Sequence, residues 1–351
     1  MIKSRPIPKP LQALHARLPG IALAVAISAL AIGLQALEIR WLGQPILESL
    51  VMAILLGMLW RNVPWPWPLL HTGPRLKPGL DFCAKPVLEL AVLLLGGTMN
   101  LGAILAAGPR LLIAVVLAVT LALAVSTLLA RRLFGLPRNP ATLIAVGNAI
   151  CGNSAIAAVA PLIGASPAEV AGAVAFTAVL GVGLVIALPL CILPLLHFTH
   201  GQYGVLVGLT VYAVPQVLAA SFPVSDLAGQ TATLVKLTRV LMLAPVALFY
   251  SLTGQKSSGR APTLKQLIPW FVAGFLLMAA LRTFGVIPTS AATVLKEVSR
   301  LLTVAAMAAM GLSVDVRALR AAGARTTGAV SVSLLFLLVL SVLLIRLLHL
   351  G

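Results

Sequence analysis

The sequence predicts an all-α, polytopic membrane protein of about 11 transmembrane helices. Of its 351 residues, 60% are hydrophobic and only 9% are charged, and the mean hydropathy is +1.08. A soluble domain carries about 25% charged residues. Apolar runs of roughly the 20 residues that cross a bilayer as a helix recur along almost the whole chain. Because little sequence remains between them, we expect one integral membrane domain over residues 1–351.

Eleven apolar segments are the candidate spans, and they cover residues 20–38, 45–60, 79–99, 110–130, 140–164, 168–196, 202–221, 229–252, 267–286, 292–313 and 326–348. An odd number of spans places the two termini on opposite sides of the bilayer. We expect residues 1–19 to form a cytoplasmic N-terminal segment, since the first apolar run is long for a signal peptide and no clear cleavage site follows it.

The basic residues predict the orientation of the chain. With a cytoplasmic N-terminus, 16 Lys and Arg residues lie in inside segments and 6 lie in outside segments, which agrees with the positive-inside rule. The C-terminus is then periplasmic. Because the net charge of +17 comes from these short loops, it indicates how the chain sits in the lipid bilayer and argues against a nucleic-acid partner.

The fifth span contains the segment 147–154, Gly-Asn-Ala-Ile-Cys-Gly-Asn-Ser. Two glycines and two asparagines weaken a helix there, and backbone freed at that depth persists only where it is buried in protein or lines a wet cavity. This pattern is typical of a discontinuous helix at a transporter's substrate site. Close helix packing through small residues is the alternative, but it does not explain the polar side chains. The expected substrate-binding residues here are Asn148, Cys151, Gly152, Asn153 and Ser154.

The seventh span contains Pro215, flanked by Tyr212 and Gln216. Proline removes a backbone donor and frees a carbonyl group. Tyr212 and Gln216 lie roughly on one helix face and are further candidates for substrate binding. The alternative is a proline-kinked packing helix that carries its tyrosine in the aromatic belt.

The eighth span contains two cations, Lys236 and Arg239, which share one face of the helix. Ionisable residues inside a membrane are functional candidates. These two need an acidic partner, a cavity lined by carbonyl groups, or an anionic ligand, unless they extend to the nearer interface. Glu89, in the third span, could form an ion pair with either cation, or could carry a proton as an ion-coupling residue.

An internal repeat becomes visible when the chain is shifted by 215 residues. Gly96–Arg110 then overlays Gly311–Arg325, with six identical positions that include both glycines and both arginines. The alternative is chance similarity between alanine-rich segments. The two copies lie an odd number of spans apart, so they would face opposite ways, and inverted repeats are typical of secondary transporters.

The three cysteines, Cys83, Cys151 and Cys191, are scattered through apolar segments and indicate neither a disulfide framework nor a metal site. No zinc-protease, phosphate-loop or paired-cysteine motif occurs. We therefore expect no cofactor, no metal and no enzymatic activity.

Three segments resemble one family. Residues 148–158, Asn-Ala-Ile-Cys-Gly-Asn-Ser-Ala-Ile-Ala-Ala, resemble the ICGxSAIAA segment of the YeiH-type (UPF0324) inner-membrane proteins, which are associated with sulfate export. Residues 236–245 are similar to that family's K-x-x-R-V-x-L-L-A-P, and residues 308–312 to its A-x-x-A-L-G-L, with Met310 where leucine is usual. The likeness covers nearly the whole chain in order. One departure is that many members have His-Glu-Val-Ala-Gln-Val at residues 212–217.

The resemblance implies a fold related to the cation/proton antiporters and bile-acid symporters, with inverted repeats, crossed discontinuous helices, and a core domain that moves against a panel domain. It implies a bacterial inner-membrane location and a secondary transporter that moves a small anion by alternating access, with sulfate, sulfite or an organosulfonate as substrate. H⁺ or Na⁺ as a coupling ion and a second copy of the chain are further candidate partners. The alternatives are a cation/proton antiporter that uses Glu89, and a membrane sensor or scaffold that transports nothing.

Overall fold

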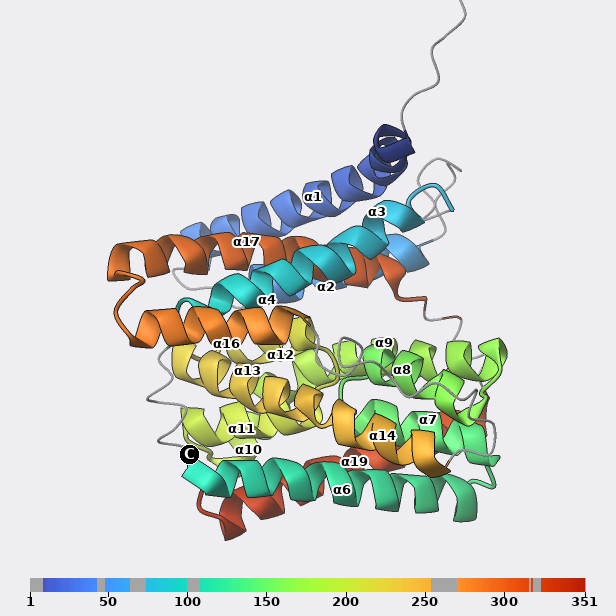
Figure 1. Cartoon of the computed structure of the whole chain (residues 1–351). Helices are drawn as coiled ribbons and strands as arrows, with labels where there is room; N and C mark the ends of the chain where they lie inside the picture. Colours follow the sequence, from blue (N-terminus) through green and yellow to red (C-terminus); the bar gives the residue numbers. More distant parts are fainter. Residues whose placement is uncertain are drawn as a thin grey trace, which may run out of the picture. The chain divides into compact units, whose positions relative to one another are not determined.

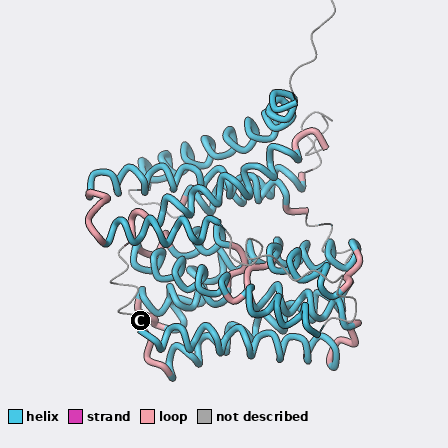
Figure 2. Tube along the Cα trace, in the orientation of Figure 1, coloured by secondary structure: helices cyan, strands magenta, loops and turns pink. Residues whose placement is uncertain are grey.

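The computed structural model describes residues 9–42, 48–63, 74–99, 108–253, 270–315, 317 and 323–350. This part of the chain is helical and has no strand, which confirms the predicted all-α class (Figure 2). Five of its helical segments are long and apolar enough to cross a membrane: Ala16–Trp41, Gly108–Arg132, Pro167–Leu196, Asp226–Thr253 and Ala324–Leu347. Each of the eleven predicted spans overlaps at least one helix. A polytopic membrane protein is confirmed, while the number of crossings stays a prediction.

The chain divides into two compact units. The first consists of Met1–Leu94 and Lys296–Asp315, and the second consists of Leu95–Leu295 and Val316–Gly351. The helices of the first unit are α1 (Lys9–Leu42), α2 (Ser49–Asn62), α3 (Lys77–Phe82), a π-helical turn (Cys83–Val87), most of α4 (Leu88–Gly96) and most of α17 (Thr289–Ser313). Since α1 already begins at Lys9, the first helix extends into the segment expected to precede the first span.

Within the first unit, α2 and α17 pack together and run in the same direction. At the start of α2, Arg300 Nη1 donates a hydrogen bond to Ser49 Oγ at 3.4 Å. At the other end, Arg61 Nη2 and Asp315 Oδ2 form an ion pair at 3.4 Å. Polar contacts therefore fix the register of the two helices at both ends of an otherwise apolar interface.

Matching glycines support the internal repeat. A Cβ atom on Gly311 of α17 would lie 3.0 Å from the carbonyl carbon of Ile54 in α2, and a Cβ atom on Gly96 of α4 would lie 3.0 Å from the carbonyl carbon of Phe275 in α16 (Trp270–Thr283). Ile54 and Phe275 are each the sixth residue of their helix. Only glycine allows the backbones to approach this closely. Equivalent glycines thus pack on equivalent positions of two different helices.

The helices that follow these glycines also correspond. α6 (Gly108–Arg132) follows α4, and α19 (Ala324–Leu347) follows α17, close to the offset of 215 residues predicted from the sequence. α6 and α19 pack against each other (Figure 1). The order α2–α4–α6 therefore returns as α16–α17–α19, while its inverted orientation in the bilayer stays a prediction. Residues 100–107, 316 and 318–322 of the predicted overlay lie outside the described residues.

The second unit contains α6, α7 (Arg138–Ala149), α8 (Asn153–Ile163), α9 (Pro167–Ala187), a π-helical turn (Leu188–Ile192), α10 (Leu193–Leu196), α11 (His200–Thr210), α12 (Val214–Ser221), α13 (Asp226–Leu241), α14 (Leu243–Thr253), α16 and α19. Polar side chains satisfy free N–H groups where several of these helices begin. At the start of α9, Glu169 Oε2 accepts a hydrogen bond from the Ser166 N–H at 2.7 Å, and Ser166 Oγ accepts one from the Glu169 N–H at 3.3 Å. This reciprocal capping box sets the first residue of the helix.

Among the described residues, two of the predicted spans are interrupted by backbone that leaves the helical conformation. The span predicted over 140–164 is divided into α7 and α8, and the span predicted over 202–221 is divided into α11 and α12. The first interruption confirms the prediction from the segment 147–154. The second differs from a proline kink, because a new helix starts there. α13 packs against α11 and α12, the two parts of the second interrupted span (Figure 1). α9 packs against α7 and α8, the two parts of the first, and also against α12.

Candidate functional site

The first interruption lies at residues 150–152, where α7 ends and α8 begins. Ile150 has φ −116° and ψ −86°, outside the helical region, and Gly152 has φ +64° and ψ −123°. An L side chain rarely adopts this second conformation, so the position requires glycine. The Gly152 N–H donates to the Gly147 carbonyl at 2.9 Å and closes the end of α7. Gly152 of the sequence motif therefore makes the break itself.

The second interruption lies at residues 211–213, between α11 and α12. Val211 and Ala213 are extended, with ψ of 142° and 145°. Pro215 lies in the first turn of α12, where its missing N–H leaves no intrahelical hydrogen bond unmade. Gln216 Oε1 accepts a hydrogen bond from the Ala213 N–H at 3.2 Å and so caps the new helix. Proline here starts a helix rather than bending one.

Lys236 of α13 connects the two interruptions. Its side chain is fully buried. Nζ donates to the carbonyl of Ile150 at the first interruption at 2.6 Å, and to the carbonyl of Val211 at the second at 2.9 Å. Both carbonyls belong to the residue that caps the C-terminal end of an interrupted helix. One ammonium group therefore satisfies two helix ends that have no intrahelical partner.

Arg239 lies one turn further along α13 and is also fully buried. Its Nε donates to the Ala149 carbonyl at 2.7 Å, and Nη2 donates to the Asn148 carbonyl. Its Nη1 donates to the Gly208 carbonyl in α11 at 3.1 Å. The guanidinium group thus binds the last turns of α7 and α11 together. Carbonyl groups fill the role for which the sequence also allowed an acidic side chain or an anion.

Within their own unit, neither Lys236 nor Arg239 forms an ion pair with a described carboxylate. Both side chains are buried rather than extended to the surface. Glu89 lies in the first turn of α4, in the other unit, so its predicted pairing with either cation stays a prediction. The carbonyl contacts stabilise the two cations without it.

Several buried polar atoms around the interruptions have no hydrogen-bond partner in the described part of the chain. They are Asn148 Nδ2 and Oδ1 in the last turn of α7, Tyr212 Oη in the second interruption, and Gln216 Nε2 in the first turn of α12. The three residues are each only 1% exposed. Leaving a buried polar group unpaired costs about 1–3 kcal/mol, so such groups are rare in folded proteins. These atoms are therefore candidate hydrogen-bonding groups for a polar ligand.

Two residues of α9, Thr177 and Gly181, also contact the candidate site. Neither was predicted from the sequence. Thr177 Oγ1 donates to Asn153 Oδ1 at 2.5 Å, and a Cβ atom on Gly152 would lie 3.5 Å from Thr177 Cβ. One turn further along, a Cβ atom on Gly181 would lie 2.6 Å from Gln216 Cδ. The only signal in the sequence is a single hydroxyl within an apolar run.

The structure brings together most of the predicted binding residues. Asn148, Cys151, Gly152, Tyr212, Gln216, Lys236 and Arg239 are all buried in the second unit. Gly152 and Tyr212 lie in contact, since a Cβ atom on the glycine would lie 3.3 Å from Tyr212 Cβ. Asn153 and Ser154 begin α8 and are exposed. No group of three or more His, Cys, Asp or Glu side chains that could hold a metal occurs among the residues the structure describes.

Comparison with known proteins gives a consistent match. A family model described as "Conserved hypothetical protein 698" matches residues 19–329. A UPF0324 membrane protein of Brucella melitensis biotype 1 is 48% identical over 332 residues, which cover 94% of this chain and 91% of the relative. A UPF0324 membrane protein of Bradyrhizobium diazoefficiens is 46% identical over 335 residues, covering 94% and 93%. One from Bacillus anthracis is 35% identical over 283 residues, covering 80% and 81%.

No solved structure matches the chain. The names of the relatives state that they are membrane proteins and specify neither a substrate nor a transport activity. The family match covers most of the chain, and the relatives align over nearly its full length. The chain therefore belongs to the UPF0324 family of membrane proteins.

Proposed function

We propose that this protein is a secondary active transporter that moves a small anion across the bacterial inner membrane by alternating access. The observation that carries the proposal is the contact of Lys236 with the carbonyls of Ile150 and Val211. This contact joins the C-terminal ends of α7 and α11 within one compact unit. Interrupted helices at a binding site are typical of secondary transporters.

The charge at this junction favours an anion. The C-terminal ends of α7 and α11 each carry roughly −0.5 charge, and the N-terminal ends of α8 and α12 each carry roughly +0.5. These four ends therefore nearly cancel, and Lys236 and Arg239 leave a net charge of about +2. No described carboxylate of their unit pairs with either cation. A cation substrate would be repelled from this junction, whereas an anion would be stabilised.

The neutral groups supply the hydrogen bonds. Every side-chain nitrogen of Lys236 and Arg239 already donates to a carbonyl, so their charge acts mainly through space. The unpartnered donors of Asn148, Tyr212 and Gln216 would contact the oxygens of the substrate directly. Three neutral donors beside a positive field suit a small oxyanion such as sulfate, sulfite or an organosulfonate. Movement of H⁺ or Na⁺ through the same unit would provide the driving force.

The proposal is tested with purified protein in proteoliposomes, by uptake and counterflow of sulfate, sulfite and methanesulfonate, with Na⁺ and pH gradients applied separately. Asn148→Leu and Gln216→Leu should abolish uptake. Ser126→Ala is the matched control, because Ser126 Oγ is also buried without a partner but lies on α6. The absence of any anion flux, together with Na⁺/H⁺ exchange that depends on Glu89, would replace anion transport with cation/proton antiport. The absence of all flux would favour a sensor or scaffold.

A further inference from the structure

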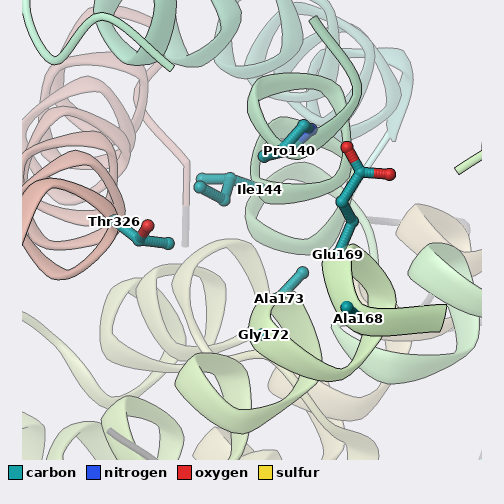
Figure 3. Close-up of a pocket in the computed structure, with 7 residues that line it drawn as sticks. All are labelled: Pro140, Ile144, Ala168, Glu169, Gly172, Ala173 and Thr326. Carbon is teal, nitrogen blue, oxygen red and sulfur yellow. The ribbon is translucent and has the colours of Figure 1, made fainter. Parts of the chain in front are cut away.

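A pocket of about 290 Å³ lies between α7, α9 and α19, all in the second unit (Figure 3). Its lining includes Pro140 and Ile144 of α7, Glu169, Gly172 and Ala173 of α9, and Thr326 of α19. Most of these groups are apolar. A second apolar pocket, of about 250 Å³, lies between the end of α9, the π-helical turn that follows it, and α19, and is lined by residues such as Leu188 and Leu335. α9 and α19 are both long and apolar enough to cross a bilayer. The apolar pockets between them therefore suit a hydrocarbon chain.

Four arginines gather at the end of the unit where the larger pocket lies. Arg138 begins α7 two residues before Pro140, and Arg325 directly precedes Thr326. Arg131 and Arg132 end α6. All four are exposed, and none forms an ion pair with a carboxylate in the described chain.

The packing of the helices holds these ends together. A Cβ atom on Gly328 of α19 would lie 2.5 Å from the ring of Phe134, which follows α6. Ala130 of α6, Ala141 of α7 and Ala329 of α19 belong to one buried cluster. The arginines therefore surround a single corner of the unit.

Glu169 is the acidic group at this corner, and the capping box at the start of α9 already uses its carboxylate. The corner therefore combines four cations, one engaged carboxylate and an apolar pocket. The loops that carry the cations are predicted to be cytoplasmic. Basic pockets between transmembrane helices on the cytoplasmic side bind anionic lipid headgroups.

We infer that this corner is a binding site for an anionic phospholipid. One acyl chain enters the pocket between Ile144, Gly172 and Thr326, and the phosphate lies on Arg138 and Arg325. The charge distinguishes this ligand from a zwitterionic lipid, and the apolar lining distinguishes it from a free phosphate. The site is separate from the interrupted helices, so the inference does not depend on the proposed transport activity.

The experiment is native mass spectrometry of delipidated protein titrated with phosphatidylglycerol, phosphatidylethanolamine and phosphatidylcholine that carry the same acyl chains. Phosphatidylglycerol should bind most tightly. Arg138→Gln combined with Arg325→Gln should weaken it roughly twenty-fivefold, since each surface cation contributes about fivefold to the affinity for an anionic lipid. The matched control combines Arg110→Gln with Arg346→Gln, which removes two exposed arginines from the opposite ends of α6 and α19 and should leave binding unchanged.

A second pair of variants tests the pocket itself. Gly172 lines the pocket and has open space where a Cβ atom would lie, so Gly172→Phe should fill it and lower phosphatidylglycerol binding. Gly183 of α9 also has open space but does not line the pocket, so Gly183→Phe is the control. Equal binding of the three lipids, or equal losses in the arginine pair and its control, would overturn the inference. Full binding in Gly172→Phe would reduce the site to surface charge and reject the pocket.

A photoactivatable phosphatidylglycerol with its reactive group in the acyl tail provides a measurement on the unmodified protein. Cross-links should fall on peptides that contain residues 168–173 or 326–335. Cross-links spread evenly over all lipid-facing helices would contradict a defined site.

Discussion

Thr177 and Gly181 lie one turn apart on α9, and each contacts a different interruption. Thr177 Oγ1 donates to Asn153 Oδ1 at the start of α8, whereas Gly181 lies against the amide of Gln216 at the start of α12. α9 is a continuous helix of 21 residues. One helix therefore contacts the first turns of both α8 and α12, so changes at Thr177 or Gly181 should alter the site directly.

Gly181→Ala should impair anion binding. Its Cβ atom would lie 2.6 Å from Gln216 Cδ, so the amide must move and the cap on the Ala213 N–H is lost. Gly183→Ala is the control, because that position is open and alanine favours a helix by about 1 kcal/mol over glycine. Anion uptake in proteoliposomes should be lost in Gly181→Ala only. Thermal unfolding compares the stability of the two variants. Equal uptake in both would show that the position of Gln216 is irrelevant.

Arg239→Gln should destabilise the protein even in the absence of any anion. The substitution removes the donors for the carbonyls of Ala149, Asn148 and Gly208, and buried carbonyls without partners should lower the free energy of unfolding by about 2–4 kcal/mol. The thermal unfolding midpoint of purified protein measures this loss, with Arg110→Gln as an exposed control. A normal midpoint with no transport would instead mean that the anion is the main partner of Arg239.

Glu89→Gln provides a separate test of the ion pair, which is one of the two alternative roles of Glu89. Because the carbonyl contacts account for the burial of both cations, Glu89→Gln should not rescue the stability of Arg239→Gln. The double variant should unfold at the same temperature as Arg239→Gln alone. Partial rescue would show that an unpaired Glu89 is the source of the instability, and would therefore support pairing with the cation.

Cysteine labelling should distinguish the two asparagines of the first interruption. With Cys83, Cys151 and Cys191 replaced, a cysteine at position 153 should react readily with a small polar thiol reagent, because Asn153 is exposed. A cysteine at position 148 should react only when substrate and a coupling gradient drive conformational change, because Asn148 is 1% exposed. A cysteine at the buried Ser126 of α6 is the inert control. Constant inertness at position 148 would favour a purely structural role for this residue.

The orientation of the chain can be checked with fluorescent fusions. The charge asymmetry predicts that a fluorescent protein fused after Gly351 is dark when exported unfolded, whereas one fused after Thr253 is bright in the cytoplasm. Bright fluorescence at both positions would indicate an even number of spans.

The sequence was sufficient to predict the helical class and the first interruption, because Gly152 and the two asparagines are poor choices for a lipid-facing helix. The second interruption is harder to predict, since Val211 and Ala213 carry no glycine-like signal. That interruption is stabilised from α13, by the donation of Lys236 to the Val211 carbonyl. The partners of both cations are backbone atoms, which residue identities do not reveal. Thr177 is missed because a hydroxyl group in an apolar helix commonly bonds to its own backbone.

The packing of Gly311 against Ile54 has a consequence for how the protein is made. α2 emerges early from the ribosome, but most of its partner α17 lies in the segment of the first unit that begins at Lys296. Translation of the intervening residues 95–295 takes roughly 10–40 s at about 5–20 residues per second. During that interval Arg61 is present in the nascent chain without Asp315, and Ile54 has no Gly311 to pack against. The first unit therefore cannot close until residues 296–315 have been made. Until then, its charged and small-residue surfaces are open to the insertion machinery and to proteases.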